Sequence, residues 1–173
     1  MKKKRTKILA GVVLLAAVLL ITGIVWAKAT HTPISGTETI TVTGPPVRDW
    51  VDDEGIAHYR GLPGVINFTS GDLDGEGSFV VNVNLDTVTG NGDESGAATI
   101  DVTWGELSGT FEGRLTAIFT AGISNGTVVY HGISGDFQGM KMMMNYSLNT
   151  TTGPPGTSWP VTYDAIVLDP HGE

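Results

Sequence analysis

The sequence predicts an all-β protein: an antiparallel meander closed into a barrel of about eight strands, preceded by one N-terminal transmembrane or signal helix. Three observations predict this fold class. An uncharged apolar run occupies residues 8–26. Beyond it, apolar and polar residues alternate with a period of two. Turn-forming residues separate the alternating segments, and no segment there has the 3.6-residue period of an amphipathic helix.

The apolar run from Ile8 to Trp26 follows a basic stub and ends just before Lys28. A helix that crosses a ~30 Å hydrocarbon core needs about 20 apolar residues, so the run is long enough to span a membrane. As an alternative, Ala27-Lys28-Ala29 fits the small-x-small pattern of signal-peptide cleavage, which would release the protein after Ala29. Both interpretations export the rest of the chain. The basic stub favours a single-pass cell-membrane protein whose C-terminal domain is extracytoplasmic.

The charge of the chain is unevenly distributed. Of 10 Lys+Arg residues, six lie within the first 28 positions, so the remainder carries four basic and 18 acidic residues, a net charge of −14. A body this acidic repels phosphate backbones, which excludes nucleic acids as a class of partner. The absence of Cys excludes disulfides and thiolate metal sites, so stability must come from packing and strand pairing.

The length of 173 residues allows one domain. We predict a signal-anchor or signal peptide over residues 1–29, a linker over 30–36 and a β-barrel domain over 37–173. The clearest strand signal runs from Glu106 to Ala121, where odd positions are apolar and even positions are almost all polar. Such a segment has one buried face and one solvated face, as an antiparallel strand does. Similar alternation marks residues 79–85, 98–104 and 159–167.

Turn signals lie between these segments. Asn125-Gly126 predicts a type I′ hairpin turn, because both residues tolerate a positive φ. Asp52–Gly55, Thr89–Gly96 and Thr152–Gly156 are predicted to connect further pairs of strands. Glycines also recur every four residues, which favours the sharp bending of a small barrel, although some fit simple turns as well. They are Gly71 and Gly75, Gly105, Gly109 and Gly113, and Gly135 and Gly139.

The predicted interior is the main candidate site, because an eight-stranded barrel can hold one small ligand. The residues expected to face inward and line it are Phe111, Phe119, Met140, Met142, Met144, Tyr146, Trp159 and Tyr163. We predict a domain that binds a small apolar ligand or a surface partner and has no assigned catalytic residue. An isomerase or cyclase would need an inward polar group with a perturbed pKa, and His131 and Glu112 are the first candidates. A structural or adhesion module that works through cations is a third alternative.

No metal or cofactor is predicted. The Met-rich face could supply thioether ligands to Cu(I), with His131 nearby, but Met also fills cores and lines adaptable pockets. Asp72–Gly77 matches the start of a calcium loop, yet Val83 stands where a bidentate Glu is required. The histidines lack metal-ligand spacing, and His58 with its neighbours fits a surface hairpin better than an acid–base group.

The segment Gly132–Gly139 has the form G-x-x-G-x-F-x-G and precedes an alternating strand over residues 140–148. It resembles the G-x-G-x-F-x-G-x-x-G region of the allene oxide cyclase and dirigent barrel group, and the resemblance covers roughly Leu107–Leu148. It implies an eight-stranded antiparallel barrel with an apolar cavity. The activities in that group are cyclisation of an unstable epoxide and stereochemical guidance of radical coupling. None of the group's catalytic residues has a counterpart that can be placed here.

Overall fold

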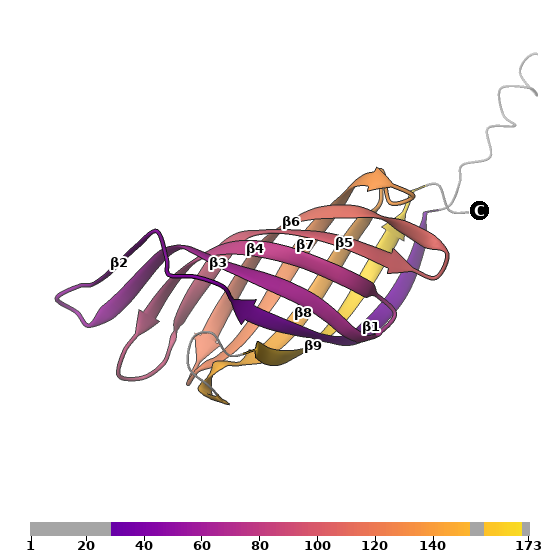
Figure 1. Cartoon of the computed structure of the whole chain (residues 1–173). Helices are drawn as coiled ribbons and strands as arrows, with labels where there is room; N and C mark the ends of the chain where they lie inside the picture. The colour runs from indigo at the N-terminus through magenta and orange to yellow at the C-terminus, as the bar shows by residue number, and fades with distance from the viewer. Residues whose placement is uncertain (1–28, 153–157, 171–173) are drawn as a thin grey trace, which may run out of the picture.

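The structure is a computed structural model that describes residues 29–152 and 158–170. In these residues nine strands form one antiparallel sheet in the order β1-β9-β8-β7-β6-β5-β4-β3-β2, and β1 also pairs with β3 (Figure 1). That pairing closes eight strands into a barrel and leaves β2 outside it. The strands are β1 (Thr30–Val42), β2 (Arg48–Val51), β3 (Ile56–Gly71), β4 (Asp74–Asp86), β5 (Gly92–Trp104), β6 (Leu107–Thr120), β7 (Ile123–Gly135), β8 (Lys141–Asn149) and β9 (Ser158–Asp169).

The closed barrel of eight antiparallel strands confirms the all-β barrel part of the predicted fold class. The alternating segment from Glu106 to Ala121 is β6, in which buried residues and exposed residues alternate from Phe111 to Thr120. Such alternation gives each barrel strand one inward and one outward face. The helix predicted over residues 8–26 lies outside the described residues. Among the described residues, no helix has the length and apolar character needed to cross a membrane.

The residues predicted as a linker belong to the barrel. Thr30–Gly36 form the first half of β1 and pair with β9 from Thr30↔Asp169 to Gly36↔Tyr163. Pairing of β1 with β3 starts only at Gly36↔Gly71, so Pro33 lies where β1 has a neighbour on one side only. A proline, which has no backbone N–H to donate, is tolerated at such an edge.

The hairpin turn predicted at Asn125-Gly126 was also wrong. The turn between β6 and β7 lies at Ala121 and Gly122, whose φ angles are +50° and +80°. Asn125 and Gly126 lie inside β7, paired with Ile118 and Ala117 of β6. Gly126 is needed there because the ring of Tyr146 on β8 occupies the space that a side chain would fill. The glycine marks a close approach within the sheet and not a turn.

The other predicted turns agree more closely with the structure. Asp52–Gly55 connects β2 to β3, and Gly55 has a φ of +83°. The connection predicted over Thr89–Gly96 is shorter, because Gly92 already begins β5. Thr152–Gly156 does lie between β8 and β9, but residues 153–157 are outside the described part of the chain.

The two ends of the barrel differ. One end, which we call the closed end, holds the β3–β4, β5–β6 and β7–β8 connections and the start of β1. There, the β7–β8 connection places Phe137 inside the barrel with no exposed surface, stacked on Phe111 at 4.7 Å between ring centroids. Leu73 from the β3–β4 connection is also buried, and its backbone N–H donates to the Tyr163 hydroxyl at 3.4 Å. Packed side chains therefore fill this end.

We call the opposite end the mouth end. It holds the β1–β2, β4–β5, β6–β7 and β8–β9 connections, and the β2–β3 hairpin projects beyond the barrel on this side (Figure 1). Exposed apolar side chains lie here, Val51 in the hairpin and Val47 just before β2. Its turn is held by Asp52, whose carboxylate accepts hydrogen bonds from the backbone N–H groups of Glu54 and Ile56.

Candidate functional site

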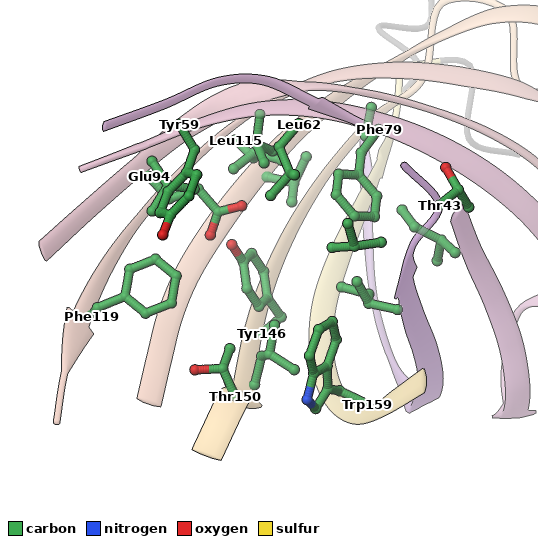
Figure 2. A pocket seen from close by; sticks show the side chains of 18 of the residues that line it. Thr43, Tyr59, Leu62, Phe79, Glu94, Leu115, Phe119, Tyr146, Thr150 and Trp159 are labelled. Atoms are coloured by element: carbon green, nitrogen blue, oxygen red, sulfur yellow. The ribbon is translucent and has the colours of Figure 1, made fainter. Parts of the chain in front are cut away.

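A cavity of about 590 Å³ occupies the barrel interior on the side of the mouth end (Figure 2). All eight barrel strands contribute to its walls. Thr43 and Pro45, in the β1–β2 connection, line the cavity and are exposed, so it reaches solvent at this end. Most of the lining side chains are apolar: Ile40, Val42, Leu62, Ile66, Phe79, Val81, Val83, Leu85, Ala98, Leu115, Phe119, Val128, Met144, Leu148 and Trp159.

The structure divides the eight predicted interior residues into two groups. All eight are buried, but only four of them line the cavity: Phe119, Met144, Tyr146 and Trp159. The other four are packed in the core without lining the cavity: Phe111, Met140, Met142 and Tyr163. The sequence pattern identified the inward faces of β6, β8 and β9, but it did not distinguish the filled part of the interior from the hollow part.

His131 and Glu112, the predicted polar candidates, do not face the cavity. They pair with each other across β6 and β7, and both are exposed on the outer face of the barrel. Their sequence neighbours Phe111 and Tyr130 are the inward residues of these strands. Since successive side chains of a strand point to opposite faces, an inward Phe111 and Tyr130 require Glu112 and His131 to point outward.

A carboxyl group does lie in the cavity, at Glu94 of β5. The Ser124 hydroxyl donates to Glu94 Oε2 at 3.4 Å, and the Tyr146 hydroxyl also hydrogen-bonds to this carboxyl. Figure 2 shows the Glu94 carboxyl on β5 and the Tyr146 hydroxyl on β8 pointing toward each other. Burial raises the pKa of Glu94 to about 7, and the hydrogen bonds from Ser124 and Tyr146 offset part of that rise.

This arrangement depends on Gly126. Because Gly126 has no side chain, the Tyr146 ring can lie against β7 at this position, and its hydroxyl extends to Ser124 and Glu94. Ser124, two residues earlier on the same face of β7, is fully buried. Burial raises the pKa of Tyr146, so its hydroxyl stays protonated and available as a hydrogen-bond donor. The absence of a side chain at Gly126 therefore allows Glu94, Ser124 and Tyr146 to form a polar cluster within an apolar wall.

A second carboxyl, Glu38 of β1, also lines the cavity. It is only 4 % exposed, and its Oε2 atom has no hydrogen-bond partner among the described residues. Burial raises the pKa of Glu38 to about 7. Trp159 lies on the neighbouring strand β9, paired with Ile40, and its Nε1 atom is likewise buried without a partner in the described chain. The cavity wall thus has one unpartnered carboxyl oxygen and one unpartnered N–H donor on adjacent strands.

Sequence reasoning missed both carboxyls, although a signal for them was present. Glu94 is even-numbered, as the inward Ile100 is, and even-numbered residues share one face of β5. Extending the alternation of residues 98–104 backward therefore places Glu94 on the inward face. The local sequence predicts a loop there instead, because residues 90–96 include three glycines, Gly90, Gly92 and Gly96. Glu38 likewise shares the parity of the inward Ile34, which lay in the segment predicted as a linker.

The alternative sites considered in the sequence analysis are separate from the cavity. His58 Nε2 contacts Asp52 Oδ2 at 2.9 Å in the β2–β3 hairpin, outside the barrel, and the hydrogen bond to Asp52 raises the pKa of His58. The inward Met142 and Met144 and the outward His131 are on opposite faces of the sheet. No group of three or more His, Asp or Glu residues suited to a metal ion occurs in residues 29–152 and 158–170.

No family model matches the chain, and no curated protein matches it either. The resemblance to the allene oxide cyclase and dirigent group therefore stays a prediction. Within its motif, Phe137 belongs to the packing of the closed end and does not line the cavity.

Proposed function

We propose that the barrel binds one small, largely apolar molecule in its cavity. The observation that carries the proposal is the cavity itself: about 590 Å³, walled mainly by aliphatic and aromatic side chains, with a few polar groups among them. Small-molecule sites generally occupy about 300–1,000 Å³ and combine apolar walls with a few placed polar groups. Eight-stranded barrels are wide enough to hold one such ligand.

The hollow half of the barrel also has small residues at positions where larger ones would fill it. Ala98 lines the cavity, and Gly96 and Gly126 lie on the inward faces of β5 and β7. The closed end has Phe111, Phe137 and Met142 in its interior instead. A chain that needed only a stable core would gain from the tighter packing that interiors normally have. The hollow half therefore supports a binding role.

The test compares two tryptophan substitutions on β6 that differ only in the face they occupy. Leu115→Trp fills part of the cavity, whereas the matched control Thr116→Trp places the same side chain on the exposed outer face. N-phenyl-1-naphthylamine, an uncharged probe near neutral pH, should gain fluorescence with the wild type and with Thr116→Trp. We expect Leu115→Trp to bind it at least about tenfold more weakly. If the wild type gives no saturable signal, the binding proposal is wrong.

A second candidate function is supported by the polar cluster of Glu94, Ser124 and Tyr146. A carboxyl group with a pKa near 7 can accept and return a proton at neutral pH, as an isomerase or cyclase requires. In this proposal, Glu94 takes a proton from carbon next to a ligand carbonyl, and the Tyr146 hydroxyl donates a hydrogen bond to the developing oxyanion.

This second candidate is tested with 2-octanone in deuterated buffer. The wild type should accelerate exchange of the protons next to the carbonyl, as followed by NMR. Glu94→Gln should reduce the exchange to the buffer rate, while Glu112→Gln on the outer face should leave it unchanged. Equal exchange rates with and without the wild-type protein would rule out this activity and leave the binding proposal intact.

We also propose that the barrel works outside the cytoplasm, tethered by the helix predicted over residues 8–26 or released after Ala29. β1 begins at Thr30, immediately after the predicted cleavage site, and Thr30 lies at the closed end. In the tethered form the closed end is therefore nearest the membrane and the cavity faces away from it. Intact mass of the exported protein distinguishes the two forms, and recovery of the chain in the cytoplasmic fraction would contradict both.

A further inference from the structure

We infer that the ligand of the cavity carries a protonated amino group, which Glu38 and Glu94 bind, on an apolar body. This inference rests on the proposed binding function and specifies the chemical class of the ligand. Of the described residues that line the cavity, only these two have an acidic side chain, and none is Lys, Arg or His. This part of the wall therefore offers negative charge and no positive charge to a ligand.

Glu38 provides the strongest argument. Its side chain lines the cavity and is almost completely buried, yet Oε2 has no hydrogen-bond partner in the described chain. A buried carboxyl group without a partner is costly, so native structures normally pair it. None of the described residues that line the cavity is Lys or Arg, so we assign the missing partner of Glu38 to the ligand.

Glu94 acts on the same part of the cavity. Both Glu38 and Glu94 interact electrostatically with the Tyr146 hydroxyl, so the three groups face a common region. The other titratable groups near Glu38 are the hydroxyls of Tyr130 and Tyr163, which stay neutral because their pKa values are raised by burial. The ionisable groups among the described lining residues are thus two carboxyls and the phenols of Tyr59, Tyr130 and Tyr146, with no cationic side chain.

The rest of the molecule favours a cation over an anion. Residues beyond position 28 carry a net charge of −14, which attracts cations to the barrel and repels fatty acids and phosphorylated lipids. The aromatic rings of Tyr59, Phe79 and Phe119 in the cavity wall are also suited to cation–π contacts. An alcohol could accept a hydrogen bond from a protonated carboxyl, but as a neutral group it would not be attracted by the negative electrostatic potential of the barrel.

The experiment compares three ligands with the same eight-carbon chain: octylamine, 1-octanol and octanoate. Calorimetric titration at about pH 8 keeps the amine protonated and most of the two carboxyls ionised. We expect octylamine to bind at least about tenfold more tightly than 1-octanol, and octanoate to bind most weakly. At about pH 6 octylamine should bind more weakly and release protons on binding, because the amine has to displace protons from Glu38 and Glu94.

Substitutions in the cavity and on the surface make the comparison specific. The double variant Glu38→Gln/Glu94→Gln should lose the preference for the amine and retain 1-octanol binding. The outer-face control Glu112→Gln should behave as the wild type does, and near-UV circular dichroism checks that each variant is folded. If 1-octanol or octanoate binds the wild type as tightly as octylamine, the amine inference is wrong while the binding proposal stands. If none of the three binds while N-phenyl-1-naphthylamine does, the amine inference is wrong, and if N-phenyl-1-naphthylamine gives no saturable signal, the binding proposal itself fails.

Discussion

The closed end and the mouth end of this barrel are built from the same strands with the same alternation, yet one is packed and the other hollow. At the closed end, Phe137 from a connection enters the barrel and stacks on Phe111. Toward the mouth end, the inward positions include Ala98, Glu38 and Glu94, and a cavity of about 590 Å³ remains. Alternation thus decides which face of a strand is inward, while side-chain size and polarity decide whether the interior is a core or a site.

The largest expected effect is a loss of stability at the closed end. Phe137→Ala removes a ring with no exposed surface, so we expect the free energy of unfolding to fall by about 3–5 kcal/mol in urea denaturation. Phe119→Ala removes a ring that borders the cavity and already lacks neighbours on one side, so a smaller loss of about 1.5–3 kcal/mol is expected. Equal losses would contradict the distinction between the two ends.

The second prediction concerns pH and the mouth-end carboxyls. Burial raises the pKa values of Glu38 and Glu94 from 4.5 to about 7. Between these values the folded state holds more protons than the unfolded state, so the free energy of unfolding falls as pH rises from about 4.5 to about 7 and beyond. Each group contributes on the order of 3 kcal/mol to this fall.

Substitution of Glu38 separates its contribution to this pH dependence from the contribution of the surface carboxyls. Glu38→Gln cannot ionise, so it should be more stable than the wild type at about pH 8 and lose that advantage at about pH 4. Urea denaturation at both pH values measures the difference, with the exposed Glu112→Gln as the control. An advantage that is the same at both pH values would show that Glu38 is not a buried, ionisable group.

Gly126 provides a third, intermediate test, because it links the sheet to the polar cluster of the cavity. Gly126→Ala places a methyl group against the Tyr146 ring, which should cost about 1–3 kcal/mol through overpacking. Displacing Tyr146 also removes a hydrogen bond that lowers the pKa of Glu94, so that pKa should rise further. Carboxyl titration by NMR would contradict the account if the pKa of Glu94 stayed the same while stability fell.

The smallest effect is expected in the β2–β3 hairpin, which lies beyond the barrel. Trp50 is 37 % exposed and stacks on His58 at 4.6 Å between ring centroids, outside the packed interior. We expect Trp50→Ala to change the free energy of unfolding by less than about 1 kcal/mol and to leave ligand binding unchanged. A loss comparable to that of Phe137→Ala would mean that the hairpin belongs to the barrel core.

The sequence predicted the barrel well where a strand alternates strictly. β6 and β8 were identified with their inward faces, because each apolar residue there alternates with a polar or exposed one. Errors arose where a glycine or proline has a role other than a turn. Gly126 makes room for Tyr146, and Pro33 occupies an edge position of β1. The local sequence predicts a turn at the first position and a linker at the second, whereas both residues lie within strands.

The cavity was harder to predict than the fold. Its existence depends on the summed volume of inward side chains from eight strands, and pairing registers have to be known before neighbours can be compared. Extending the alternation pattern places Glu38 and Glu94 on inward faces. A carboxyl on an inward face, however, contradicts the usual rule that such faces are apolar. Exceptions of this kind tend to occur at functional sites.

The methionines of β8 give the most direct test of the difference between the two ends. Met144 lines the cavity, Met142 is buried without lining it, and Met143 is on the outer face of the same strand. With ¹³C-labelled methionine methyl groups, octylamine should shift the Met144 signal strongly in a saturable manner and leave those of Met142 and Met143 nearly unchanged. A shift at Met143 without one at Met144 would place the ligand on the barrel surface and contradict the account.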